Sequence, residues 1–354
     1  MTEQELIGLW DLASTVDPTL RLYHKSAIPQ LRTKRVKPGP FSRLRLFSRM
    51  TKGLPSLFTD FPVFVKATPV TDRRALLLKN IKTGFPRQRI ALAQVRSSQC
   101  VNMKVSELIR CWERGRSVVS VTDLHFRGTK FEKTIEAAAL SDFNILCLDP
   151  ALRENLEMMT IVISSRGNLT DIHTDDCDGS NHCFLGKKLW LSWDRMEGTA
   201  RGFEDVDRDD VRSRATFDLR TFLSLPSSHW FVVSENQTLF LPGHLSHKVV
   251  TLEDYIGVGS FHVALPSYVM ALRRWILHDT LNVGPDKLLD RINRAVIRTI
   301  RRLQRAPNRL KERWGLNYLP SSIDKWQTIE KSGTRRMLMQ NQAFSSFLDA
   351  ARKG

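Results

Sequence analysis

Six short runs of β-branched and aromatic residues lie between residues 116 and 265, and they constrain the fold more than any other feature of the sequence. Each run is about ten residues long or shorter and is bounded by Gly, Pro, Asn or Asp, which is typical of strands that end in turns. They predict a barrel or a sandwich of strands. The runs are 116–123, 157–165, 183–193, 229–235, 237–242 and 256–265.

The regions on either side of these strands have a different character. Residues 25–52 contain many basic residues and no Asp or Glu, and prolines interrupt any long helix there. We therefore expect residues 1–56 to form a mobile or surface-laid basic arm. A strand-rich domain is expected over 57–266. Residues 267–354 are expected to form a basic helical region, because apolar residues recur there at three- and four-residue steps after Pro285.

The net charge of +17 favours a polyanionic partner such as nucleic acid. The basic arm is the predicted contact, through Arg32, Lys34, Arg35, Lys37, Arg43 and Arg45. No stretch approaches the roughly 18 to 20 uninterrupted apolar residues of a membrane-spanning helix. Acids near the start, where a signal peptide has a basic end, predict an intracellular protein, and the charge favours the nucleus over the cytoplasm.

His173 and Asp175 are two residues apart, so in a strand their side chains point to the same side. A histidine from another strand would complete a set of three metal ligands, and we choose His247 for that position. Two neutral imidazoles and one carboxylate on one face of an octahedron are typical of non-haem iron(II) oxygenases, because the opposite face stays open.

Other residues compete for these roles. His244 is the main alternative to His247, while His182 and His262 are more typical of buried structural histidines. Asp176 should face away from Asp175 in a strand. The five cysteines form no C-x-x-C pair and no ordinary zinc pattern, so we expect reduced thiols.

The spacing around these residues resembles that of the JmjC family of oxygenases. Thr170 lies three residues before His173, Lys188 lies fifteen residues after it, and His247 follows Pro242 by five. The run T-D-I-H-T-D is similar to the T-D-x-H-x-D of lysine demethylases and hydroxylases in that family. The likeness covers about 115–265.

The resemblance implies a mainly β fold, a double-stranded β-helix of the cupin or jelly-roll type, followed by the helical C-terminal region. It implies iron(II) held by His173, Asp175 and His247, with no catalytic residue beyond these ligands. The cosubstrate would be 2-oxoglutarate, bound through the Thr170 hydroxyl and through Lys188, which pairs with the far carboxylate. Lys187 is the alternative to Lys188.

The expected activity is oxidative hydroxylation or N-demethylation of a protein substrate, such as a histone or another chromatin-associated protein. A catalytically silent scaffold that binds chromatin or nucleic acid is the alternative from a different functional class. A third hypothesis is an oxygenase that acts on a small molecule, in which the basic segments would play no part.

Overall fold

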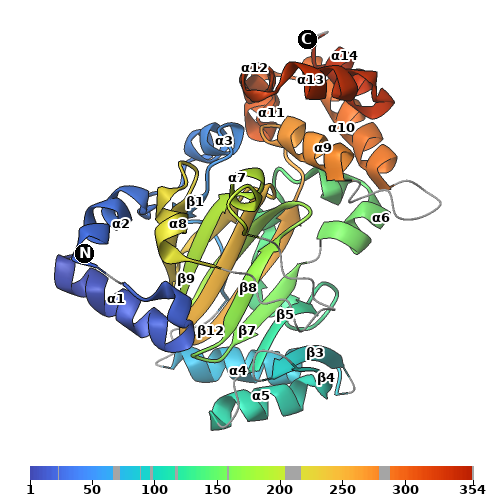
Figure 1. The fold of residues 1–354 in the computed structure, drawn as a ribbon. Helices are drawn as coiled ribbons and strands as arrows, with labels where there is room; N and C mark the ends of the chain where they lie inside the picture. Colours follow the sequence, from blue (N-terminus) through green and yellow to red (C-terminus); the bar gives the residue numbers. More distant parts are fainter. Residues whose placement is uncertain are drawn as a thin grey trace.

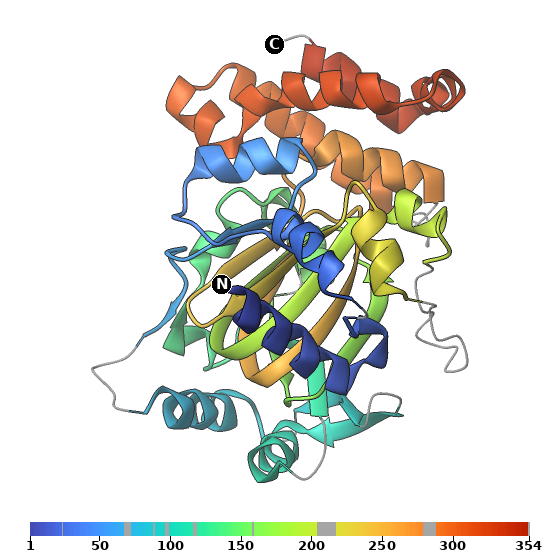
Figure 2. The same ribbon diagram turned by 60° about the vertical axis from the view of Figure 1, so that its left-hand side comes forward.

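A computed structural model describes residues 1–22, 24–66, 72–87, 89–95, 99–115, 119–157, 159–203, 217–278 and 288–352. Its centre is an antiparallel sheet (Figure 1). Helices α9 to α14 gather at one end of this sheet, whereas α4 and α5 lie at the other end (Figures 1 and 2). Among the described residues, no helix has the length and apolar character needed to cross a membrane.

The strands are β1 (Ser56–Phe58), β2 (Phe64–Val65), β3 (Ile90–Val95), β4 (Gln99–Lys104), β5 (Val119–His125), β6 (Ile135–Glu136), β7 (Thr160–Ser164), β8 (Leu169–Thr174), β9 (Asp178–Asp194), β10 (His229–Ser234), β11 (Thr238–Leu241) and β12 (Leu245–His262). The helices are α1 (Glu3–Val16), α2 (Ile28–Lys34), α3 (Arg43–Thr51), α4 (Arg73–Gly84), α5 (Val105–Arg114), α6 (Pro150–Leu152), α7 (Arg195–Thr199), α8 (Leu219–Ser224), α9 (Tyr268–His278), α10 (Leu288–Gln304), α11 (Asn308–Trp314), α12 (Leu319–Ile329), α13 (Ser332–Gln340) and α14 (Gln342–Arg352). The helix start expected at Pro285 lies outside the described residues.

The prediction of a mainly β, double-stranded β-helix barrel is wrong. Helix accounts for 50% of the described residues and strand for 26%. The main sheet runs in the order β1-β11-β9-β12-β7-β5-β3-β4 and does not close, because β1 and β4 each have one described neighbour at the two ends of this path. The β3–β4 hairpin extends the sheet outward, and α4 and α5 pack on its buried side.

The fold-class prediction rested on the runs of strand-forming residues and did not include the helices that precede and interrupt them. Several of these helices begin with N-terminal caps that can be found in the sequence. Thr2 and Glu5 form a capping box on α1, Ser42 caps α3 and Asp72 caps α4. Helices therefore occur before and between the strands as well as in the C-terminal region.

The long strands β9 and β12 pair along most of their lengths and carry the centre of the molecule. The first half of β12 also pairs with β8, and its second half pairs with β7. Register shifts between Thr251 and Gly257 separate these two halves. The three strands β8, β12 and β9 therefore lie side by side in that order, and they form the platform for the candidate site.

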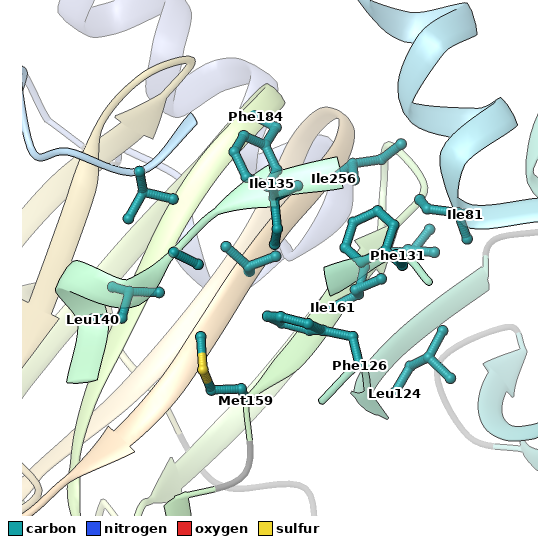
Figure 3. Close-up of a cluster of buried hydrophobic side chains, with 14 of the residues drawn as sticks. Ile81, Leu124, Phe126, Phe131, Ile135, Leu140, Met159, Ile161, Phe184 and Ile256 are labelled. Atoms are coloured by element: carbon teal, nitrogen blue, oxygen red, sulfur yellow. The ribbon is translucent and has the colours of Figure 1, made fainter. Parts of the chain in front are cut away.

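The two faces of this platform differ. On one face, Leu189, Leu191 and Val250 pack against Leu6 and Trp10 of α1, and α1 crosses the sheet in Figure 2. A second apolar cluster, centred on Phe126, Phe131, Ile161 and Ile256, fills the space beside β5 and β7 (Figure 3). The opposite face of these strands carries polar side chains, among them His173, His247 and Lys188, beside the apolar Trp190 and Val249.

Residues 1–56 are packed on the body of the protein. The indole nitrogen of buried Trp230 donates a hydrogen bond of 2.6 Å to the carbonyl oxygen of Leu31. The Lys34 ammonium donates to the carbonyl oxygen of Leu225 at 2.5 Å. Together with buried Leu6 and Trp10, these contacts make the segment part of the folded core. Its removal would therefore uncover apolar surface as well as delete positive charge.

Candidate metal centre and adjoining cation

The structure brings the three predicted ligands together. One possible ligand atom from each of His173, Asp175 and His247 lies within 4.8 Å of the others. The Nε2 atom of His247 is 3.7 Å from Oδ2 of Asp175, and the two imidazole rings have centroids 4.0 Å apart. Within the described part of the chain, no other group of three His, Cys, Asp or Glu side chains meets this arrangement.

The strand register explains why these side chains meet. His173 on β8 is the direct partner of His247 on β12, and paired residues in a sheet share a face. Asp175 follows His173 by two residues, directly after β8 ends. Between this pair and the pair Thr170–Val249, two residues of β8 oppose one of β12, which is a β-bulge. The bulge places Thr170 on the same face as His173 despite their odd separation.

The surroundings of the two imidazoles suit metal ligation. Burial, with a further contribution from His173, lowers the pKa of His247 to about 3, so its ring is neutral at physiological pH. Nδ1 of His173 lies 2.8 Å from the carbonyl oxygen of Asp171. A carbonyl can only accept, so Nδ1 donates to it, and Nε2 is the ring nitrogen left to face a metal.

These donors fit a divalent metal that has an open face. Three donors on one octahedral face, with metal bonds of about 2.1 Å, lie about 3 Å apart. The 3.7 Å between His247 and Asp175 needs only a small contraction to reach this spacing. Two nitrogens and one carboxylate suit iron(II), and manganese(II) or nickel(II) could take its place.

The structure separates the competing residues from this centre. An added Cβ on Gly53 would lie 2.7 Å from the His244 ring, so His244 packs against that glycine. His182 contacts Thr238 and His262 contacts Ser180, each at 2.8 Å and buried. These histidines contribute to the interior packing of the protein.

Asp176 does not join the centre, since its Oδ1 lies 3.4 Å from Nη2 of Arg274. Neither nearby Asp178 nor the described cysteines belong to the ligand set. Asp178 accepts a hydrogen bond from the backbone nitrogen of Gly243 at 2.9 Å and another from Ser267. Burial raises the pKa of Cys183 to about 12, so its thiol is protonated. Cys177 and Cys183 are both free thiols, as expected.

Lys188 is a buried cation on the same face as the three ligands. Its residue is 3% exposed, and it pairs in register with Thr251 of β12. Its ammonium lies 4.5 Å from the centre of the Tyr255 ring. No described residue forms an ion pair or hydrogen bond with it, and burial lowers its pKa to about 7. Lys187, in contrast, is exposed and pairs with Glu253 at 2.6 Å.

Asn168 is a polar residue near Lys188 that sequence reasoning missed. It is fully buried, and neither atom of its side-chain amide has a hydrogen-bond partner among the described residues. Its carbonyl accepts from the backbone nitrogen of Thr251, the register partner of Lys188. Thr170 follows two residues later on β8. Lys188, Asn168 and Thr170 therefore offer one cation, one amide and one hydroxyl in the same part of the sheet.

Sequence reasoning also missed the network behind His173. Lys248 is buried, and its ammonium lies 3.0 Å from Oδ2 of Asp17 and 2.5 Å from Oδ1 of Asp171. Asp171 is the residue whose carbonyl orients His173. Because Asp17 ends α1, the N-terminal segment is connected to a candidate metal ligand through two ion pairs. In the sequence, Lys248 is a single basic residue within a strand, and nothing in the pattern around it indicated these ion pairs.

We expect Lys248→Met to lower the free energy of unfolding by about 3 to 5 kcal/mol, because buried Asp17 loses its cation. The metal affinity of the folded protein should fall about 10- to 100-fold, since Asp171 is no longer held in place. Urea denaturation and metal titration measure the two effects.

Adding Asp17→Asn to that variant should restore part of the stability, because an amide needs no counter-charge. Lys187→Met is the matched control, as it removes an exposed lysine from the neighbouring strand. Equal stability of Lys248→Met and the wild type would show that the ion pairs do not support the site.

Arg274 on α9 connects the helical end of the protein to both sides of the centre. It is 4% exposed, and its guanidinium donates to the carbonyl oxygens of Asp175 and Gly243. These carbonyls belong to the ligand Asp175 itself and to the turn that leads to His247. The sequence shows Arg274 only as one of many arginines in a basic region.

Comparison with protein-family models finds no match to the chain, and comparison with curated proteins likewise finds none. A functional assignment therefore rests on the residues of the centre and on their geometry.

Proposed function

We propose that the protein is an iron(II)- and 2-oxoglutarate-dependent oxygenase, with the site chemistry of JmjC enzymes, that hydroxylates or N-demethylates a protein such as a chromatin component. One observation carries the proposal: a His-Asp-His cluster shares a sheet face with a buried lysine that has no acidic partner among the described residues. A buried cation without an anion is costly, so its retention favours an anionic ligand.

The separation of the two features suits a five-carbon dicarboxylate. Thr251, the register partner of Lys188, lies four residues along β12 from His247, or about 13 Å at roughly 3.3 Å per residue. The side chains of Lys188 and His247 cover part of this distance. A 2-oxo acid that chelates the metal at one end would present its far carboxylate toward the lysine.

Each residue has a defined task in this proposal. His173, Asp175 and His247 hold the metal on one face, and the opposite face is left for cosubstrate and oxygen. Iron(II), when bound, supplies the activation of oxygen. Lys188 neutralises the far carboxylate, and Thr170 and Asn168 can donate hydrogen bonds to it. Trp190 stacks on His247 with ring centroids 5.4 Å apart and shields that ligand from water.

A silent scaffold is less well supported. Such a protein would need neither a His-Asp-His cluster on one sheet face nor a buried lysine without an acidic partner among the described residues. The direct test is formation of succinate from 2-oxoglutarate by the full chain, dependent on iron(II). Failure of the metal-loaded wild type to form succinate, with a range of methylated and unmodified histone peptides present, would refute the proposal.

The affinity for 2-oxoglutarate should depend on pH. The pKa of Lys188 is lowered to about 7 in the free protein, and a bound carboxylate raises it again. Binding above pH 7 therefore takes up a proton. The dissociation constant should rise about tenfold per pH unit above 7, until the pKa of the bound state is reached.

Isothermal titration of the metal-loaded protein between pH 6 and 9 measures this dependence. The control ligand is 2-oxobutyrate, which has the same chelating end but no far carboxylate, so its affinity should not show the tenfold step. A pH-independent affinity for 2-oxoglutarate would mean that Lys188 does not contact it.

A further inference from the structure

We propose that the outward face of α10, with the turn that follows it, binds the phosphate backbone of duplex nucleic acid. This inference is independent of the oxygenase proposal. We define the arginine stripe as Arg294, Arg298, Arg301 and Arg305, with Arg302 beside it.

The stripe follows from helical geometry. At 100° per residue, the four arginines fall within about 60° of one another around the helix axis. They extend over about 16 Å, with steps of about 5 Å between neighbours. All of them and Arg302 are exposed. A row of guanidinium groups at this spacing can follow successive phosphates, and each group can bind phosphate oxygens in a bidentate manner.

No acidic residue neutralises the charge of the arginine stripe. From Arg291 to Lys311 the sequence contains no Asp or Glu. The stripe arginines form no ion pair with any residue in the described ranges, whereas Arg291, at the edge of the same helix, pairs with Asp149 at 2.8 Å. Exposed Arg309, in α11, continues the positive surface beyond the turn. The local potential therefore attracts an extended polyanion.

The basic arm is a weaker candidate for this role than the sequence indicated. Lys34 donates to backbone carbonyls, Arg43 pairs with Asp142, and Arg35 and Arg45 lie over aromatic rings. Of the six basic residues predicted to contact nucleic acid, Arg32 and Lys37 are exposed and the other four are half-buried. Four of these six side chains are therefore engaged in contacts within the protein.

The opposite face of α10 argues against a membrane as the partner. An interfacial helix needs a free apolar face that can enter the lipid. Here that face is buried, with Ile292, Val296 and Ile300 packed in the C-terminal core. Helix α14 covers part of it, since Asn293 and Gln304 donate to backbone carbonyls of Ala343 and Ala350. Only the arginine face remains available for contact with a partner.

The test compares the wild type with a stripe variant, Arg294→Gln, Arg298→Gln, Arg301→Gln and Arg305→Gln. Glutamine keeps helix propensity and removes the charge. Binding to a fluorescent mixed-sequence DNA duplex is measured by anisotropy over a series of salt concentrations. Each lost phosphate contact should reduce the slope of log affinity against log salt by about 0.9, so the stripe variant should lose about 3 to 4.

The matched control variant removes the same number of charges from exposed positions elsewhere, through Arg32→Gln, Lys37→Gln, Lys79→Gln and Arg110→Gln. Its slope should stay close to that of the wild type. An equal loss in both variants would show an effect of net charge alone, and would overturn the proposal. So would absence of duplex binding by the wild type at low salt, or binding only to phosphatidylserine vesicles. If the stripe variant fails to fold, the pair Arg298→Gln and Arg301→Gln should still lose about 2.

Discussion

Replacing His247 by alanine is expected to abolish binding of iron(II), manganese(II) or nickel(II). An open facial site has only three protein donors, so the loss of one removes a third of the ligand set. His247 is also the buried member, 2% exposed and directly opposite His173 in the sheet. Alanine at His173 or Asp175 should have the same effect. Calorimetric titration of each variant with the metal measures the loss of binding.

His244→Ala is the matched control for this prediction. It removes the histidine in the turn between β11 and β12, three residues before His247. The ring of His244 lies against Gly53 and not beside the three candidate ligands. This variant should retain full metal occupancy. Retention of metal by the His247 variant, combined with its loss in the His244 variant, would show that the ligand assignment is wrong.

Lys188→Met is expected to have opposite effects on binding and on stability. The affinity for 2-oxoglutarate should fall on the order of ten- to a hundredfold, because a charge-assisted contact is lost. Metal affinity should stay nearly unchanged. The free energy of unfolding at pH 7 should rise on the order of 1 to 4 kcal/mol, because an apolar side chain of similar length replaces a desolvated ammonium.

The stability gain should depend on pH. Below pH 7 the folded wild type carries the buried charge, and its full cost is present. Between about 7 and the ordinary lysine pKa, the folded protein binds fewer protons than the unfolded chain, so wild-type stability rises with pH. The difference between the two proteins should therefore shrink as pH increases.

Denaturant titrations at pH 6, 7 and 9 measure the stability difference. Lys187→Met, which affects only the exposed pair with Glu253, should change neither stability nor affinity appreciably. If Lys188→Met destabilised the protein and left 2-oxoglutarate binding intact, Lys188 would be a structural residue.

The sequence allowed the three candidate ligands to be chosen because their relations are local or follow a short spacing. His173 and Asp175 share a face by strand alternation, and His247 was preferred to His244 because its spacing from Pro242 resembles that of the JmjC family. Lys188 could be preferred to Lys187 on the same alternation. Asn168 and Lys248 gave no such signal, since their importance depends on which strand lies next to them and on the β-bulge at Asp171 and Ile172.

Closure of the sheet could not be judged from the sequence. Strand runs predict strands, but they do not show that the β3–β4 hairpin would extend the sheet at one end. The arm shows a similar limit. Its arginines and lysines were counted as free charges, although contacts such as that between Lys34 and Leu225 hold them. These contacts join residues that are far apart in the chain, which composition cannot reveal.

The packing of the first helices against later strands has a consequence for synthesis on the ribosome. The hydrogen bond from Lys34 to Leu225 spans 191 residues. At translation rates of about 5 to 20 residues per second, the first segment leaves the ribosome about 10 to 40 seconds before its docking surface exists. During that interval Leu6, Trp10 and Leu31 have no core to enter. The nascent chain therefore presents a basic, apolar segment that chaperones can bind until Trp230 has been translated.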